Sequence, residues 1–247
     1  MITRMVQVGL TAVAALLITV QLGSAAYAWG TGASSTWQEE FDISRCNLVT
    51  TGRNPYFVLE PGVQLVYEGG DAKLQITVLD ETKVVNGVRT RVVEEKEWKD
   101  GKLHEIAKNY FAMCEQTKDV LYFGEDVDFY EDGKVVKHDG SWLAGNGNRP
   151  GLMMAGEPKV KMKYYQELAP GVAMDRAEIV SLDETCQTPA GTFSSCMKVK
   201  ETSAIDVTAS EHKYYAPAIG LVRDEALRLT RYTSARVDAV EPSSGKR

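Results

Sequence analysis

The stretch AKLQITVLDETKVVNGVRT, residues 72–90, decides the fold class of this chain. Leu74, Ile76 and Val78 alternate with polar residues, which is the two-residue period of a strand with one buried face. Asn86-Gly87 then stands between two short runs of strand-forming residues, and this dipeptide favours the two-residue turn of a β-hairpin. The stretch therefore predicts two antiparallel strands joined by a tight turn.

The same pattern recurs along the chain. Asp100-Gly101 and Asp132-Gly133 give two further hairpin turns, and more alternating segments occur at 159–167, 177–184, 192–201, 211–215 and 227–232. No segment longer than about ten residues has the 3.6-residue period of a helix. We expect an all-β protein, an antiparallel meander of about ten strands curled into a half-barrel, a barrel or a sandwich.

The N-terminal residues have the pattern of a secretory signal peptide. Arg4 supplies a positive end, residues 8–20 are apolar, and Ala26-Tyr27-Ala28 is a small-x-small cleavage site. We expect residues 1–28 to be removed and the product to be exported, to the periplasm or the medium. A tail at 29–53, a single β domain at 54–240 and a C-terminal tail at 241–247 would then follow.

The net charge of the 247-residue chain is −6. An acidic chain is a poor partner for nucleic acid, so we expect no nucleic-acid binding. No apolar run after the signal peptide approaches the length of a membrane-spanning helix, so we expect no membrane span in the mature chain.

Four cysteines, Cys46, Cys114, Cys186 and Cys196, follow the predicted cleavage site. An even number in an oxidising compartment favours disulfides. Cys186 and Cys196 flank a turn segment, so we expect a bridge across that hairpin and a second bridge between Cys46 and Cys114. A three-residue loop would place Cys196 one diagonal step from Cys186, whereas a longer loop or a bulge would place the two directly opposite. Buried free thiols are the alternative.

No catalytic or metal-binding pattern is present. The acidic run at 125–132 lacks the glycine of a calcium loop, and cross-strand pairing with lysines explains its charges. His104, His138 and His212 have no second metal ligand at a recognisable spacing, and there is no Gly-x-Ser-x-Gly nucleophile motif. We therefore expect no catalytic residue, no metal and no cofactor, and a protein that is not an enzyme.

Large apolar residues lie in a Gly-rich segment at 141–158, among them Trp142, Met153 and Met154. Such groups need an apolar environment, because a loop of this composition has few ladder hydrogen bonds to hold it. They either plug the open end of the curled sheet or form an adaptable wall for a ligand. We take Trp142, Met153 and Met154 as candidate ligand-binding residues.

Several motifs resemble those of a family of exported bacterial β-rich proteins that has no established function. They are NPYFVLEPG at 54–62, YFGED at 122–126, GSW at 140–142, PG at 150–151, PAGTF at 189–193 and YYAPAIGLV at 214–222. Ala218 stands where the family more often has Gly. A weaker similarity is to periplasmic curved-sheet carriers of lipids or lipoproteins. The resemblance implies an exported, compact β domain and supplies no catalytic or ligand-binding residue.

Together these observations favour an exported, non-catalytic β protein that binds an apolar, lipid-like small molecule or an envelope protein. One alternative is a structural or interaction module whose core is filled by its own side chains. An enzyme of unrecognised class is the other, since catalytic groups can converge from distant strands.

Overall fold

The computed structural model describes residues 36–233. The predicted signal peptide at 1–28 and the predicted C-terminal tail at 241–247 lie outside the described residues. Apart from one short 3-10 helix, η1 (Ile43–Arg45), the regular structure of the described part is β. The prediction of an all-β protein is confirmed.

The strands follow one another closely along the chain. They are β1 (Leu48–Val49), β2 (Gly52–Asn54), β3 (Phe57–Leu59), β4 (Gln64–Gly69), β5 (Ala72–Val85), β6 (Val88–Lys99), β7 (Lys102–Cys114), β8 (Val120–Glu131), β9 (Lys134–Lys137), β10 (Trp142–Leu143), β11 (Arg149–Met154), β12 (Lys163–Tyr165), β13 (Glu167–Leu168), β14 (Asp175–Thr188), β15 (Gly191–Ser203), β16 (Ser210–Ala216), β17 (Gly220–Asp224) and β18 (Leu227–Thr233).

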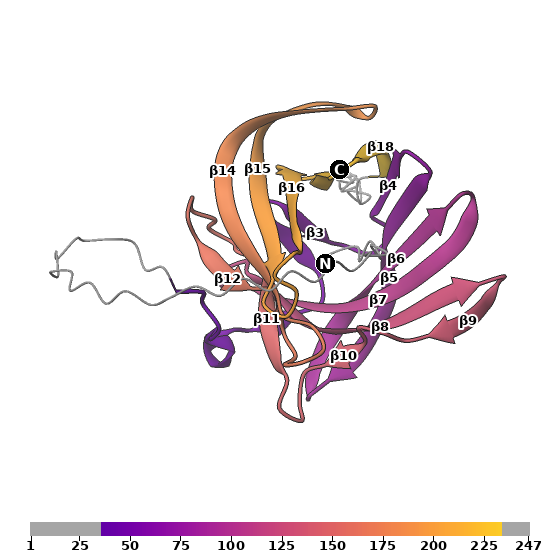
Figure 1. The fold of residues 1–247 in the computed structure, drawn as a ribbon. Coiled ribbons are helices and arrows are strands. Elements are labelled where there is room, and N and C mark those ends of the chain that lie inside the picture. Colours follow the sequence, from indigo (N-terminus) through magenta and orange to yellow (C-terminus); the bar gives the residue numbers. More distant parts are fainter. Residues whose placement is uncertain (1–35, 234–247) are drawn as a thin grey trace, which may run out of the picture.

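Sixteen of these strands form one antiparallel sheet, in the order β12-β14-β15-β16-β17-β18-β4-β5-β6-β7-β8-β11-β13, with β1, β9 and β10 attached at its sides. The sheet curls until it is nearly closed into a barrel (Figure 1). The count exceeds the ten strands expected because several strands are only two to four residues long. Segments so short have no periodicity that a sequence can display.

The Asn86-Gly87 turn forms as predicted. Val85 pairs with Val88, and both turn residues have positive φ angles, 47° and 79°. Asp100-Gly101 repeats this geometry between β6 and β7, with φ angles of 49° and 73°. Turns of this hand match the right-handed twist of the flanking strands, which explains why these dipeptides mark the hairpins.

β-Bulges bend the longest hairpin of the barrel. The register between β14 and β15 shifts three times, between Ile179 and Ser181, between Ser181 and Glu184, and between Glu184 and Cys186. Each extra residue increases the local twist and bends the strand. The arch of β14 and β15 over the barrel is visible in Figure 1.

The segment at 163–168 joins the two edges of the sheet. Its first part, β12, pairs with β14, and its second part, β13, pairs with β11. Gly151 on β11 permits this close approach, because a Cβ at that position would lie 2.0 Å from the carbonyl oxygen of Gln166. The seam between β11 and β14 is thus spanned by only a few residues of strand.

Candidate functional site: an apolar cavity with an acidic end

A cavity lies inside the barrel. Its walls come from β3 to β7 on one side and from β16, β17 and the turn between them on the other, with Met153 of β11 between the two. Its volume is about 60 Å³, measured as the space open to the centres of water-sized molecules. This is room for a small apolar group and not for a long acyl chain.

Strand β5 supplies one wall of the cavity. Leu74, Ile76 and Val78 of β5 all line it, since every second residue of a strand faces the same side. Phe57 and Phe111 contact each other edge to face, with ring centroids 5.2 Å apart, and add aromatic surface. Most of the cavity wall is therefore hydrocarbon.

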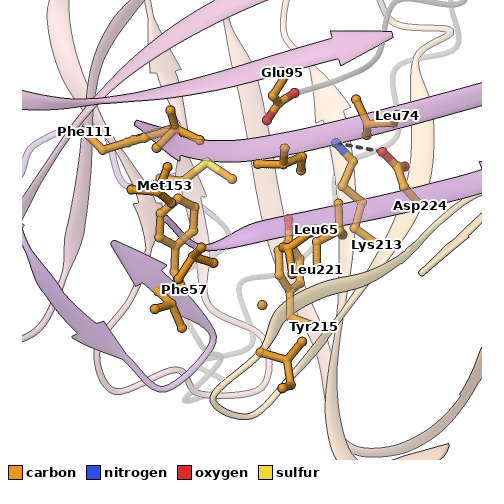
Figure 2. Close-up of a pocket in the computed structure, with 17 residues that line it drawn as sticks. Phe57, Leu65, Leu74, Glu95, Phe111, Met153, Lys213, Tyr215, Leu221 and Asp224 are labelled. Carbon is orange, nitrogen blue, oxygen red and sulfur yellow. Dashed lines mark ion pairs between the residues drawn. The ribbon is translucent and has the colours of Figure 1, made fainter. Parts of the chain in front are cut away.

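One end of the cavity is polar. Glu95, Lys213 and Asp224 lie there, while Phe57 and Phe111 lie toward the other end (Figure 2). The Lys213 ammonium is only 3% exposed, and its Nζ lies 3.0 Å from Glu201 Oε2, 3.2 Å from Glu211 Oε1 and 3.6 Å from Asp224 Oδ2. One buried cation is thus surrounded by three carboxylates.

Further hydrogen bonds fix the best-buried carboxylate of this cluster. Gln166 Nε2 donates to Glu201 Oε1 over 3.0 Å, and the Tyr215 hydroxyl lies 3.4 Å from the same oxygen. Gln166 comes from the segment that joins the sheet edges, so this contact links the barrel seam to the acidic end. A buried charge with several hydrogen-bond partners is a rigid feature of a core.

The pKa values follow from burial and from the excess of acids. Burial by itself lowers the pKa of Lys213, but Asp224, Glu201 and Glu211 together raise it well above its ordinary value. Burial tends to raise the pKa of Glu201, yet Lys213 holds it below the ordinary value. Burial raises the pKa of Glu211 to about 7 and also raises the pKa of Asp224. Lys213 therefore favours the ionised form of Glu201, while burial favours the protonated forms of Glu211 and Asp224.

Glu95 occupies a separate position on the cavity wall. Its side chain is half-buried and lines the cavity from β6, and Figure 2 shows its carboxyl group directed inward. Within residues 36–233 it makes no hydrogen bond or ion pair. Burial raises the pKa of Glu95 to about 7, although the charge of Lys213 opposes that rise.

Two further acids with raised pKa values, Glu125 and Glu167, do not line the cavity. Burial raises the pKa of Glu125 to about 8, and burial together with Asp175 and Glu125 raises that of Glu167 well above its ordinary value. Glu125 on β8 pairs in register with Trp142 on β10. The barrel interior therefore contains acidic groups at two places.

The three candidate ligand residues are placed differently from one another. Met153 lines the cavity, and its sulfur lies 3.8 Å from Gln166 Nε2. Trp142 is buried and packs edge to face on Tyr122, with ring centroids 5.4 Å apart, outside the cavity lining. Met154 is also buried and is not part of the lining. Only Met153 of the three is in position to touch a ligand in this cavity.

The structure contains one of the two expected disulfides. Cys46 and Cys114 are bridged, which fits an oxidising compartment, whereas Cys186 and Cys196 are buried thiols. The turn and the bulges place Cys186 opposite Phe193 and Cys196 opposite Glu184, so the two cysteines are not directly paired. Burial and a hydrogen bond with Cys196 raise the pKa of the Cys186 thiol to about 12, which makes it a weak nucleophile.

Sequence reasoning missed Glu95, Glu201, Lys213 and Asp224. A signal for two of them was present, because Glu201 and Lys213 fall at inward positions of predicted strands, in step with Val199 and Tyr215. A charge at an inward position is unusual and calls for a partner. The pairing of β15 with β16 that brings these charges together could not be read from either strand alone.

Over residues 36–233, no group of three or more His, Cys, Asp or Glu side chains is arranged to hold a metal ion. In the same part of the chain, no helix is long and apolar enough to cross a membrane.

These features define an antiparallel, nearly closed barrel with an apolar interior cavity that is acidic at one end. A family model described as DUF3108-like matches residues 160–229, which include β12 to β17 and part of β18. A crystal structure of a "putative lipoprotein" from Parabacteroides distasonis is similar at 13% sequence identity and a TM-score of 0.35, covering 74% of this chain and 100% of that one. Comparison with curated proteins gave no match.

Proposed function

We propose that this chain is an exported, non-catalytic protein that binds a small apolar molecule, or the apolar end of a larger one, inside the barrel. The observation that carries the proposal is the cavity itself. Apolar side chains from opposite walls of the barrel face a space that they do not fill. Close packing is the rule in protein interiors, so a hydrocarbon-lined space of this kind is a candidate binding site.

The composition of the wall supports binding and not chemistry. Leu74, Ile76, Phe111 and Met153 offer dispersion contacts and an adaptable thioether. Lys213 is already engaged by three carboxylates, and the Cys186 thiol is held protonated by its raised pKa. Neither is available as a nucleophile at neutral pH.

Toluene is a suitable probe because it is small and carries no polar group. In methyl-labelled protein we expect saturable shifts of the NMR signals of Leu74, Ile76 and Met153 on titration with toluene. Ile76→Phe should abolish these shifts by filling the cavity. Val84→Phe is the matched control, since Val84 lies on the same strand and is 61% exposed. Absence of saturable shifts in the folded wild-type protein would refute the proposal.

The small cavity volume favours one other candidate function. A barrel whose core is nearly filled by its own side chains could serve as a structural or interaction module, and burial of Trp142 and Met154 outside the cavity suits that role. In that case Ile76→Phe would leave partner binding unchanged and would affect stability alone.

A further inference from the structure

The charge balance at the polar end of the cavity selects the head group of the ligand. Three carboxylates, those of Glu201, Glu211 and Asp224, surround the ammonium group of Lys213, and a further carboxyl group, that of Glu95, lines the same end of the cavity. The ammonium group is shared among three of the acids at 3.0–3.6 Å and offers nothing to an incoming anion. A carboxylate or phosphate placed here would meet like charges in a poorly solvated site.

Glu95 differs from these three acids because it does not pair with Lys213. Its carboxyl group faces the cavity and makes no hydrogen bond or ion pair with any residue in the described range. A half-buried carboxylate without a donor is less well solvated than an exposed one, and a ligand that brings a donor offsets that cost. A positively charged donor recovers more, because hydrogen bonds between opposite charges are stronger than neutral ones.

Resting on the function proposed above, we infer that the ligand is an amphipathic amine, with its apolar part between β5 and β17 and its protonated nitrogen at Glu95. The hydrocarbon end of the cavity, near Phe57 and Phe111, takes the apolar part, and the acidic end takes the ammonium group. Fatty acids and other anionic amphiphiles of the same size are rejected by the same charges.

Three probes that share a phenyl ring separate the head groups: benzylamine, benzyl alcohol and benzoate. Toluene, the probe used above, reports on the apolar part alone. At about pH 8 benzylamine should bind about tenfold more tightly than benzyl alcohol, the expected gain from a charge-assisted hydrogen bond, and benzoate should show no saturable binding. Methyl NMR titration measures the affinity of toluene and of each of the three phenyl probes.

Glu95→Gln tests the assigned residue. It should remove the preference for benzylamine and leave toluene affinity within about twofold, because the amide keeps the shape and loses the charge. Glu94→Gln is the matched control, since Glu94 is adjacent on β6, does not line the cavity and pairs with Lys96 over 2.7 Å. That variant should keep the wild-type preference. Thermal unfolding shows whether both variants are folded. The comparison of the four probes on the wild-type protein tests the head-group preference without either variant.

The outcomes are distinguishable. Toluene binding with equal or tighter binding of benzoate, or an amine preference that survives in Glu95→Gln, would overturn the head-group inference and leave the proposed function standing. If toluene and all three phenyl probes fail to bind the folded wild-type protein, the proposed function fails and the inference fails with it.

Discussion

Replacing Lys213 with Met removes the cation that pairs with Glu201, Glu211 and Asp224. The ammonium group makes three ion pairs at 3.0, 3.2 and 3.6 Å and is 3% exposed. Met has a similar length and keeps the apolar contacts, so the change isolates the charge. Removing one partner of a buried ion pair costs about 3–5 kcal/mol, mostly because the opposite charge is left uncompensated.

Two features of the cluster set the expected value within that range. Glu201 keeps its hydrogen bond from Gln166, at 3.0 Å, and its contact with Tyr215, which offsets part of the loss. Glu211 and Asp224 have raised pKa values and lose less by becoming protonated. We therefore expect a loss of about 3 kcal/mol in the free energy of unfolding at pH 7.5.

The pH dependence distinguishes lost charge from lost packing. Without Lys213, the pKa of Glu201 is no longer held down, so the acids of the cluster take up protons as the pH falls and the repulsion disappears. The loss should shrink to about 1 kcal/mol at pH 5. Urea unfolding, followed by tryptophan fluorescence at pH 7.5 and pH 5, measures the loss of unfolding free energy at each pH. Lys200→Met, on the neighbouring strand β15, is the control and should change stability by less than about 0.5 kcal/mol. An equal loss at pH 5 and 7.5 would refute the electrostatic reasoning.

Three further predictions concern the barrel as a whole. Burial raises the pKa of Glu95 to about 7 and that of Glu125 to about 8, so the folded state holds more protons than the unfolded state from about pH 4.5 upward. The free energy of unfolding should therefore fall as the pH rises through this window, in contrast to a protein with exposed acids. A midpoint of urea unfolding that rises from pH 5 to pH 8 would contradict this prediction. The double variant Cys46→Ala/Cys114→Ala opens a loop of 68 residues and should lose up to about 4 kcal/mol relative to the oxidised wild type in the loop-entropy model. Thermal unfolding measures the loss, and the reduced wild type should be as unstable as the variant; equal stability of the variant and the oxidised wild type would contradict the prediction. Trp142→Ala should lower the free energy of unfolding by about 3–5 kcal/mol and change toluene affinity less than threefold, because the indole is buried outside the cavity lining. Calorimetry measures the stability and the NMR titration measures the affinity. A large loss of affinity would place Trp142 at the site.

Local features of the fold could be predicted from the sequence, while those that depend on bulges could not. Asn86-Gly87 and Asp100-Gly101 define their hairpins because the turn requires positive φ angles, which these residue types adopt readily. Farther from the turn the register shifts. A bulge beside Trp98 pairs Glu97 with Glu105, where a regular hairpin would have paired Lys96 with it. An extra residue changes every later pairing, and its position depends on curvature and not on local sequence.

The candidate site shows the same division between local and distant information. The inward positions of Leu74, Ile76 and Val78 follow from alternation alone. The acidic end depends on β6, β15, β16 and β17 meeting across the barrel, and the partners of a buried Lys213 are not adjacent to it in sequence. Trp142 and Met154 are candidates from the sequence because they are large and apolar, a property that core residues and ligand-contacting residues share.

The pairing of β18 with β4 has a consequence for how the protein is made. The backbone N–H of Gln64 donates to the hydroxyl of Thr233 over 3.0 Å, across 169 residues of chain. The hairpins from β4 to β8 can form as soon as they are synthesised, but the wall from β16 to β17 arrives almost at the end. Until then Leu74, Ile76 and Val78 present a continuous apolar face to any other chain nearby. The side chains that line the cavity in the finished barrel are therefore the ones that a growing chain most needs to have shielded from aggregation.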